Sequence, residues 1–494
     1  MAYCFDRMFY LENRLGAQSN VLISAHYAPT TATQTTHLSK DAVYAATRSV
    51  LEVYPELSMI AIPQATKKGT HHLVMAALHE IDLETCVEFL DDAEPKCTPE
   101  VVERFHNEWP WTDDKFHPRK PWWKVVVLGR QEVAFVFHHV IADGRFGQFF
   151  HREFLTALNS YNKDKGPSSL IIKIDPARVR LSKELEEFWI SSYSVIYMIH
   201  TFIILLLMRL IFRGKLLFND VPKPKPHFDS AVDDAPPESR TVSRVAGIRI
   251  SSPRIRRIIS ACREQKTSFT PFFLTMLMCT VACDYYPNAK VGISNCAIDT
   301  RPVYPQDKPG SKTGKLLQCS AGVRKLPWLD NYRRVFSSQT AEDLRRQGEK
   351  KSGIDVDGAW DLVRGYRESI MKALEGKEAP AVVIFKASNG VSPDLEGMLK
   401  QNFPAMGLHL NNCVALSNLG SFSVPDQQGP WKVDEMSFSA APVNGNISYE
   451  ISIHVSGAEG GDTVVNASYQ DGILTEEMVS GILNGALTRM EALL

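Results

Sequence analysis

Two adjacent histidines, followed closely by an aspartate and a glycine, are the residues of this sequence whose types and spacing could do chemistry. Residues 133–137 are apolar and run directly into His138 and His139, and Asp143 and Gly144 follow after three apolar residues. An imidazole with a pKa near its ordinary value of ~6.5 can accept a proton from a substrate at neutral pH. A lone histidine at a strand end would more simply be a hydrogen-bonded core residue, but this combination favours a catalytic loop.

A strand, a loop and a helix must hold these residues in place. The strand-like segments 124–128 and 133–137 flank Gly129-Arg130-Gln131-Glu132, a pattern that predicts a hairpin leading into the histidines. Beyond the glycine, Phe150, Phe154 and Leu158 recur four residues apart, which predicts one face of a helix. The expected unit places His139 at the carboxyl end of a strand.

The segment His138-His139-Val140-Ile141-Ala142-Asp143-Gly144 resembles the HHxxxDG motif of the chloramphenicol-acetyltransferase-like superfamily. That superfamily includes peptide-synthetase condensation domains, plant BAHD acyltransferases and fungal alcohol acetyltransferases, and in length this chain is most similar to the last. The resemblance implies an α/β fold of two lobes with an active-site tunnel between them. It also implies acyl transfer from an acyl-CoA, most simply acetyl-CoA, to an alcohol, with His139 as general base and no covalent intermediate.

The resemblance gives the other motif residues supporting roles. Asp143 is expected to be structural, because it would point away from the tunnel and pair with an arginine. By the same resemblance, Arg301 in Asp299-Thr300-Arg301 best matches that partner. Arginine suits the role because its planar fork can grip a carboxylate with two bonds; an exposed charge beside a proline turn is the alternative. Gly144 would permit close approach of backbone or substrate, and His138 would be a packing and hydrogen-bonding neighbour.

Two segments of the second half of the chain could add to the site. Residues 414–420 again resemble a family segment and would place Ser417 and Asn418 near the tunnel, where a hydroxyl or amide could face a tetrahedral intermediate. An ordinary strand-terminal turn is the alternative. Three lysines of a glycine-containing loop could meet the phosphates of CoA or could simply be solvated: Lys308, Lys312 and Lys315. No residue is therefore assigned to CoA binding.

Size and composition agree with two lobes. The chain has 494 residues, 44% of them hydrophobic, which is enough for two cores. We expect an N-terminal lobe at 1–187 that carries the motif, an apolar helix and Pro-rich linker at 188–240, and a C-terminal lobe at 241–494. In that last lobe a strict alternation of apolar residues predicts a half-buried strand: Ile447, Tyr449, Ile451, Ile453 and Val455.

Charge and cysteine content limit the partners and the compartment. A formal net charge of -1 lacks the basic excess that nucleic-acid binding requires. The nine cysteines are scattered, with no CxxC pair and no metal-type spacing, so we expect no metal and reduced thiols in a cytoplasmic protein. The N-terminus has no basic region followed by an apolar core, and no secretory signal is indicated. A monomer is expected.

Residues 188–208 form an uncharged, mostly apolar run that Arg209, Arg213 and Lys215 follow. A bilayer span needs about 20 such residues, but a single crossing would place the two lobes on opposite sides of the membrane. A buried helix or a wall of the tunnel is another interpretation. We expect instead a peripheral membrane contact through residues 188–218.

Two absences in the sequence bear on the branch of the superfamily. No DFGWG-like segment is present, which disfavours the plant branch, and no carrier or adenylation region accompanies the motif, which disfavours a condensation module. The expected acceptor is a small alcohol or a hydroxylated compound of secondary metabolism. Transfer to an amine or sphingoid base, and a non-catalytic relative that binds a lipid or metabolite, are the alternatives.

Overall fold

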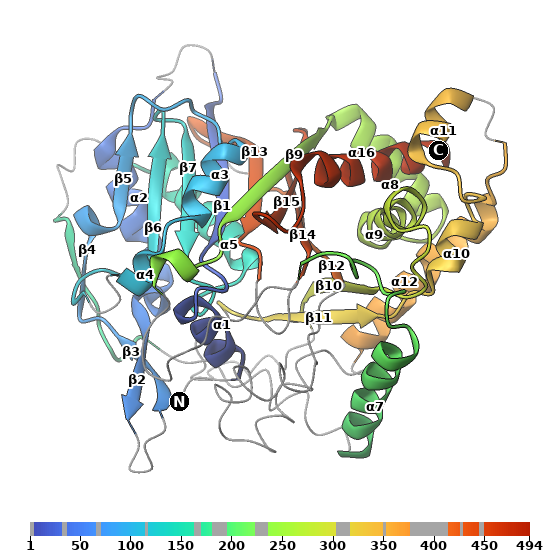
Figure 1. Cartoon of the computed structure of the whole chain (residues 1–494). Coiled ribbons are helices and arrows are strands. Elements are labelled where there is room, and N and C mark those ends of the chain that lie inside the picture. Colours follow the sequence, from blue (N-terminus) through green and yellow to red (C-terminus); the bar gives the residue numbers. More distant parts are fainter. Residues whose placement is uncertain are drawn as a thin grey trace.

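The computed structural model describes residues 4–31, 37–65, 71–113, 117–162, 169–179, 195–222, 236–302, 317–348, 352–375, 413–424, 428–443 and 449–494. Two β-sheets, each packed against helices, lie side by side and form two lobes (Figure 1). The first lobe is built mainly from the N-terminal part of the chain, and the second from the part after residue 240.

The sheet of the first lobe has the strand order β13-β1-β7-β6-β5. Its strands are β1 (Val21–Pro29), β5 (Val87–Leu90), β6 (Trp123–Leu128), β7 (Glu132–Phe137) and β13 (Trp431–Ala440). Strand β7 is central and buried on both faces: Phe135 and Phe137 join one core, whereas Ala134 and Val136 join another. This two-sided burial explains why the run before the histidines is continuously apolar.

Helices cover both faces of that sheet. Helices α2 (Lys40–Val53) and α5 (Gly144–Asn159) pack against each other on one face, and α3 (Pro99–His106) belongs to the core of the other. Shorter elements complete the lobe: η1 (Pro55–Ser58), the ribbon β2 (Met59–Ala65) with β3 (His71–Ala77), the pair β4 (Glu80–Asp82) with β8 (Ile171–Lys173), η2 (Leu83–Thr85) and α4 (Pro110–Asp113). Helix α1 (Cys4–Arg14) lies between the two lobes (Figure 1).

The sheet of the second lobe has the order β11-β10-β12-β14-β15-β9. Its strands are β9 (Ser243–Ile250), β10 (Ile293–Asp299), β11 (Ser320–Lys325), β12 (Cys413–Phe422), β14 (Ile451–Ala458) and β15 (Thr463–Gln470). Its helices are η5 (Pro237–Ser239), α8 (Ser252–Glu264), α9 (Phe269–Thr280), the π-helical turn η6 (Val281–Tyr285), α10 (Leu329–Arg334), α11 (Ala341–Gln347), α12 (Val356–Leu374) and α16 (Glu476–Ala492).

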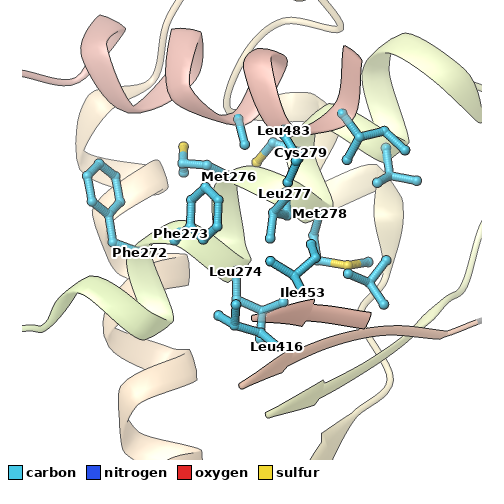
Figure 2. Packing of buried hydrophobic residues seen from close by; sticks show 14 of the residues in the cluster. Phe272, Phe273, Leu274, Met276, Leu277, Met278, Cys279, Leu416, Ile453 and Leu483 are labelled. Atoms are coloured by element: carbon cyan, nitrogen blue, oxygen red, sulfur yellow. The ribbon is translucent and has the colours of Figure 1, made fainter. Parts of the chain in front are cut away.

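Helix α9 is the centre of the second core. It is apolar on all sides because it lies between α16 and the sheet, as Figure 2 shows. Leu416 of β12 and Ile453 of β14 pack beneath Leu274. Since successive side chains of a strand point to opposite faces, this packing directs Ser417 and His454 to the other face, toward the first lobe.

Strand β13 joins the two halves of the chain. It belongs to the segment after residue 241, yet it pairs antiparallel with β1 from Val21↔Ala440 to Pro29↔Trp431 and so completes the first sheet. The division into 1–187, 188–240 and 241–494 stays a prediction, and no division along the sequence anticipates this exchange. The C-terminal part of the chain therefore supplies the edge strand of the first lobe's sheet.

Residues 195–208 of the apolar run belong to helix α7 (Val195–Ile211), which projects at the edge of the second lobe (Figure 1). Residues 188–194 of the run lie outside the described residues. Met208 and the following Phe212 anchor it against Leu216, Val291 and neighbouring apolar residues. Among the described residues no single helix is long and apolar enough to cross a membrane; the bent pair 252–264 and 269–285, with a 99° bend, meets the criterion by length and composition. Much of that pair is the buried helix α9.

Candidate active site

A cavity of about 160 Å³ lies between the two lobes. Its walls come from α1, from the motif loop after β7, from β13, and from the face of the second sheet formed by β10, β11, β12 and β14. His139, Asp143, Gly144 and Ser417 are among the lining residues. The structure therefore brings together four of the residues that the sequence singles out.

His139 stands at the end of β7 with its ring in this cavity. The ring of Phe9, from α1, lies flat on the imidazole, with ring centroids 3.8 Å apart and planes inclined by 6°. The Nδ1 atom is buried and has no hydrogen-bond partner among the described residues. Burial lowers the pKa of His139, and the backbone of His139 and Ala142 together with the Asp143 carboxylate only partly oppose it. The imidazole is therefore neutral at pH 7, as a base must be.

His138 points into the first lobe instead. Its ring stacks on Trp122 with centroids 4.9 Å apart, and its Nδ1 accepts a hydrogen bond of 3.0 Å from the backbone N–H of Val140. Burial lowers the pKa of His138 to about 3, and the neighbouring His139 adds to the effect. The geometry fits the packing and hydrogen-bonding neighbour expected from the motif.

Asp143 is directed away from His139 and ties three segments together. Its carboxylate caps α5 by accepting from the N–H of Phe146 at 2.9 Å, and it accepts from the N–H of Cys319 at 2.7 Å. Its own N–H donates to the carbonyl of Leu317. A carboxylate with this many donors orients the loop, and within the described part of the chain none of these hydrogen bonds involves the imidazole of His139.

Arg301 is the charged partner of Asp143, as predicted from the sequence. Its Nη2 donates to both carboxylate oxygens, at 2.9 and 3.0 Å, and also to the carbonyl of Leu317 at 2.9 Å. Its Nη1 contacts Asp299 at 2.9 Å. Burial alone would lower the pKa of Arg301, but the Asp143 carboxylate outweighs it and the pKa is raised. The pair joins the motif loop to the end of β10, in the other lobe.

Gly144 is required by close packing against β13. A Cβ at this position would lie 2.7 Å from Cζ of Phe438 and 3.2 Å from a methyl group of Leu419. The absent side chain thus lets the first turn of α5 sit under Phe438, which itself lines the cavity. Backbone and aromatic ring make the close approach that the sequence predicts for this glycine.

The floor of the cavity is a face of the second sheet, where small and polar side chains alternate with the core. One row across it holds Arg324, Asn295, Ala415 and Ser452, each paired with the next in register. These residues all line the cavity. The floor is therefore open enough to admit a ligand and polar enough to bind one.

The next row brings Ser417 beside His454, since the two are direct partners in β12 and β14. The Nε2 of His454 lies 3.2 Å from Oγ of Ser452, and burial lowers the pKa of His454 to about 3. In the same row Gly322 makes room for Asn295, because a Cβ there would lie 2.8 Å from its Oδ1. Ser417 thus sits in the cavity next to a neutral imidazole.

Asn418, which the sequence places near the tunnel, does not line the cavity. The side chain of Asn418 donates to Oγ1 of Thr270 at 2.9 Å and accepts from the N–H of Gly420 at 2.8 Å, so it closes a turn and does not line the cavity. Lys308, Lys312 and Lys315 lie outside the described residues. The structure brings Ser417 to the site and separates it from Asn418.

Sequence reasoning missed several cavity residues: Phe9, Glu12, Asn295, Arg324, Tyr449 and His454. A signal existed for one of them. In the alternating run of β14, Ile451 and Ile453 are core residues, so Ser452 and His454 occupy the opposite face. A histidine on the polar face of a half-buried strand looks solvent-exposed until the second lobe is placed over it.

Comparison with known proteins decides the family. A family model described as alcohol acetyltransferase matches residues 5–309, which include the motif and Arg301. The chain belongs to the alcohol acetyltransferase family. The predicted family is therefore confirmed, and the protein is an enzyme of the acyltransferase class.

Two fungal relatives resemble this family member over most of its length. A probable alcohol acetyltransferase of Fusarium pseudograminearum is 22% identical over 420 residues, which cover 82% of this chain and 77% of the relative. A probable alcohol acetyltransferase of Aspergillus fumigatus is 23% identical and covers 96% of this chain and 95% of the relative. Membership in this family implies acetyl-CoA as the co-substrate and an alcohol as the acceptor.

Solved structures confirm the two-lobed chloramphenicol-acetyltransferase-like fold. The trichothecene 15-O-acetyltransferase of Fusarium sporotrichioides superposes with a TM-score of 0.64 at 12% identity, over 99% of this chain and 94% of that one. A condensation domain of the calcium-dependent antibiotic synthetase gives 0.56 at 10% identity, over 99% and 95%. These likenesses establish the fold, and the alcohol acetyltransferase family is set by the sequence match.

Proposed function

We propose that this alcohol acetyltransferase moves an acetyl group directly from acetyl-CoA to a hydroxyl, with His139 as the general base. One observation carries the proposal: the ring of His139 lies in the inter-lobe cavity, while burial keeps its imidazole neutral. Positioned general-base catalysis is typically worth about 10² to 10⁴ in rate. Asp143 and Gly144 act by shaping the loop that presents this base.

The proposed reaction needs no covalent enzyme intermediate. The Nε2 of His139 takes the hydroxyl proton as the alcohol oxygen bonds to the thioester carbonyl carbon. The resulting tetrahedral intermediate collapses, its carbon–sulfur bond breaks, and the CoA thiolate receives the proton from the imidazolium. The base is restored, and an acetyl ester and free CoA leave.

Ser417 is the proposed donor to the negative oxygen of that intermediate. It lines the cavity, and His454 stands next to it in register. A pre-placed donor aimed at the developing oxyanion is worth about 10² to 10³ in kcat where one has been removed. The side chain of Asn418, the other residue considered for this role, instead forms hydrogen bonds with Thr270 and Gly420.

Release of CoA thiol from acetyl-CoA, measured against panels of alcohols and of amines, tests the reaction. Transfer to alcohols that His139→Ala abolishes, with an unchanged thermal unfolding curve, is the expected result. Unchanged transfer by His139→Ala would overturn the base. Transfer confined to amines would replace the hydroxyl acceptor with the N-acetylation alternative.

We further propose that α7 docks on an anionic membrane surface. Five aliphatic residues spaced three or four apart form one exposed stripe: Ile196, Ile199, Ile203, Leu207 and Leu210, with exposed fractions of 78, 54, 45, 45 and 66%. Exposed Arg213 and Lys215 follow at the end of the helix. Aliphatic side chains beside cations suit the boundary between acyl chains and anionic head groups.

Flotation with vesicles of neutral lipid, with and without phosphatidylserine, tests this docking. The variant Ile199→Ser/Ile203→Ser should bind vesicles less than the wild type, while Val356→Ser, at a 40% exposed aliphatic residue of α12, should bind as the wild type does. Full retention by the α7 variant would remove the proposal. Lower retention on purely neutral vesicles is expected because the cations then lack a partner.

A monomer in the cytoplasm is the proposed working form. The cysteines whose burial is described are all buried and free, among them Cys86, Cys296 and Cys413, as suits a reducing compartment. Sedimentation of the purified protein and fractionation of the producing cell test the two parts separately. A stable dimer, or recovery from a secreted fraction, would contradict them.

A further inference from the structure

The inter-lobe cavity gathers buried polar atoms that the fold itself leaves unpaired. Within the described part of the chain, Oε2 of Glu12, Oδ1 of Asn295, Nδ1 of His454 and Nε of Arg324 are buried and have no hydrogen-bond partner, and all four residues line the cavity. Leaving such a group without a partner is unfavourable, because the group loses its hydrogen bonds to water and gains none in the protein. Buried polar groups are nearly always paired in native proteins, so the set indicates a ligand with several polar groups.

Glu12 is the least expected member of this set. It belongs to α1, and only 8% of its surface is exposed. It lies three residues after Phe9 in the sequence, and the ring of Phe9 covers His139. Residues three apart share a helix face, about 4.5 Å apart along the axis. The carboxyl group therefore lies about one helical turn from the residue that covers the catalytic imidazole.

The end of α1 is held firmly, so Glu12 is fixed in place. The side chain of the next residue, Asn13, donates to the carbonyls of Gln18 and Ser19 at 3.0 Å and accepts from Oγ1 of Thr112 at 2.9 Å. Gln18, in turn, donates to the carbonyl of Ala441. The fold thus satisfies Asn13 fully and leaves its neighbour Glu12 facing the cavity.

The surroundings of Glu12 favour a neutral carboxylic acid. Burial raises the pKa of Glu12 to about 8, and among the described residues no cation opposes the shift. Tyr449 lines the same cavity; burial raises its pKa, Arg324 opposes this, and the Glu12 carboxyl adds a smaller upward push. A neutral carboxyl both donates and accepts, which matches a hydroxyl group better than it matches a cation.

We propose that Glu12 binds a second hydroxyl of the acceptor, remote from the one that is acetylated, so that the preferred acceptors are alcohols carrying a further hydroxyl. The inference rests on the proposed function for the identity of the reacting group. Asn295, 6% exposed and with a free carbonyl oxygen, offers a further acceptor atom on the floor of the same cavity. An acceptor with one hydroxyl and an apolar remainder would leave these atoms unpaired.

Binding without acetyl-CoA tests this specificity apart from catalysis. The full-length protein is titrated calorimetrically with terminal diols from propanediol to hexanediol, with the monohydric alcohols of the same length, and with the corresponding amino alcohols. A diol should bind about tenfold more tightly than its monohydric counterpart, the worth of one net hydrogen bond to a buried group. The ratio of KM values for the same pairs should show a preference of similar size.

Variants at position 12 and a matched control separate recognition from general damage. Glu12→Gln keeps a group that accepts and donates and should retain most of the diol preference, whereas Glu12→Leu should abolish it. The control is Glu132→Gln, because Glu132 is also a buried acid with an unpaired Oε2 but does not line the cavity. It should leave the diol preference at the wild-type value.

Each outcome is decisive. Equal binding of diols and monohydric alcohols by the wild type, or a preference that survives Glu12→Leu, would overturn the proposal. A preference for amino alcohols that Glu12→Gln removes would replace the hydroxyl with a cation as the group bound. Diol preference that depends on Glu12 in a protein that acetylates no alcohol would refute the proposed function while supporting this inference. Acetyl transfer to alcohols without any preference for diols would support the proposed function and refute this inference.

Discussion

The ring of Phe9 covers the imidazole of His139 face to face, at a centroid distance of 3.8 Å. One ring comes from the first helix of the chain and the other from the end of β7. The stack shields His139 from water on that face, and burial is the main reason that its pKa is lowered. Helix α1 therefore adds to the burial that lowers the pKa of the proposed base, and it also forms part of the cavity wall.

The pH profile of kcat/KM follows from this stack. A histidine base works when neutral, and because its pKa is lowered, activity should persist below pH ~6.5 and fall only at more acidic pH. Phe9→Ala should expose the ring, raise the pKa toward its ordinary value and move the acidic limb upward. Phe9→Leu, which keeps an apolar cover, is the control and should move it less. An acidic limb already at or above pH ~6.5 in the wild type would contradict the argument.

The pair Asp143 and Arg301 should act through the position of the loop. Both side chains are largely buried, with 3 and 12% exposed, and removing one partner of a buried pair typically costs about 3 to 5 kcal/mol. Arg301→Ala and Asp143→Ala should each lower the free energy of unfolding in urea and reduce kcat. The double variant should lose less than the sum of the two, since the second substitution removes a charge already left unpaired. Additive losses would show that the two residues act independently.

The sequence predicts those site residues that lie close together in one motif, and it does not predict those that are brought together only by contacts between the lobes. His139, Asp143 and Gly144 lie in one short segment, and the two-lobed fold followed from its resemblance to a known motif. Arg301 could be named because the resemblance supplied a partner 158 residues away, at the end of a strand. The wall formed by α1 carries no local signal, because Phe9 and Glu12 acquire their roles only from contacts between lobes.

Strand β13 could not be predicted from the sequence for a different reason. Its apolar residues fall out of phase, with Trp431 and Val433 before a bulge and Met436 and Phe438 after it. The pairing with β1 skips a residue there, since His26 faces Glu435 while Tyr27 faces Val433. A bulge reverses which face each parity of residue occupies, so a search for strict alternation does not find the strand. Its pairing with β1 in the other lobe's sheet joins residues far apart in the sequence, and a local sequence pattern does not predict such a pairing.

Gly144 offers a test of packing at the entrance to α5. Gly144→Ala places a Cβ 2.7 Å from the ring of Phe438, and overpacking of this kind typically costs about 1 to 3 kcal/mol. Thermal unfolding and kcat should both fall. Phe438→Leu in the same chain should restore part of the stability by vacating the space. If Phe438→Leu restores none of the stability and kcat lost in Gly144→Ala, the glycine is needed for its backbone conformation and not for the space beside Phe438.

Acid should destabilise the fold steeply because several histidines are buried in neutral form. Burial lowers the pKa of His106, His138 and His454 to about 3 each and that of His151 to about 4. The unfolded chain protonates these groups near pH ~6.5, so below that pH it binds more protons than the native state. The free energy of unfolding should therefore fall with decreasing pH from ~6.5 to about 3, by roughly 1.4 kcal/mol per pH unit for each group.

His106, which hydrogen bonds Ser439 and does not line the cavity, is the residue to remove. His106→Gln should make the slope shallower by about one such increment in urea titrations across this range, whereas an unchanged slope would show that His106 does not titrate with unfolding.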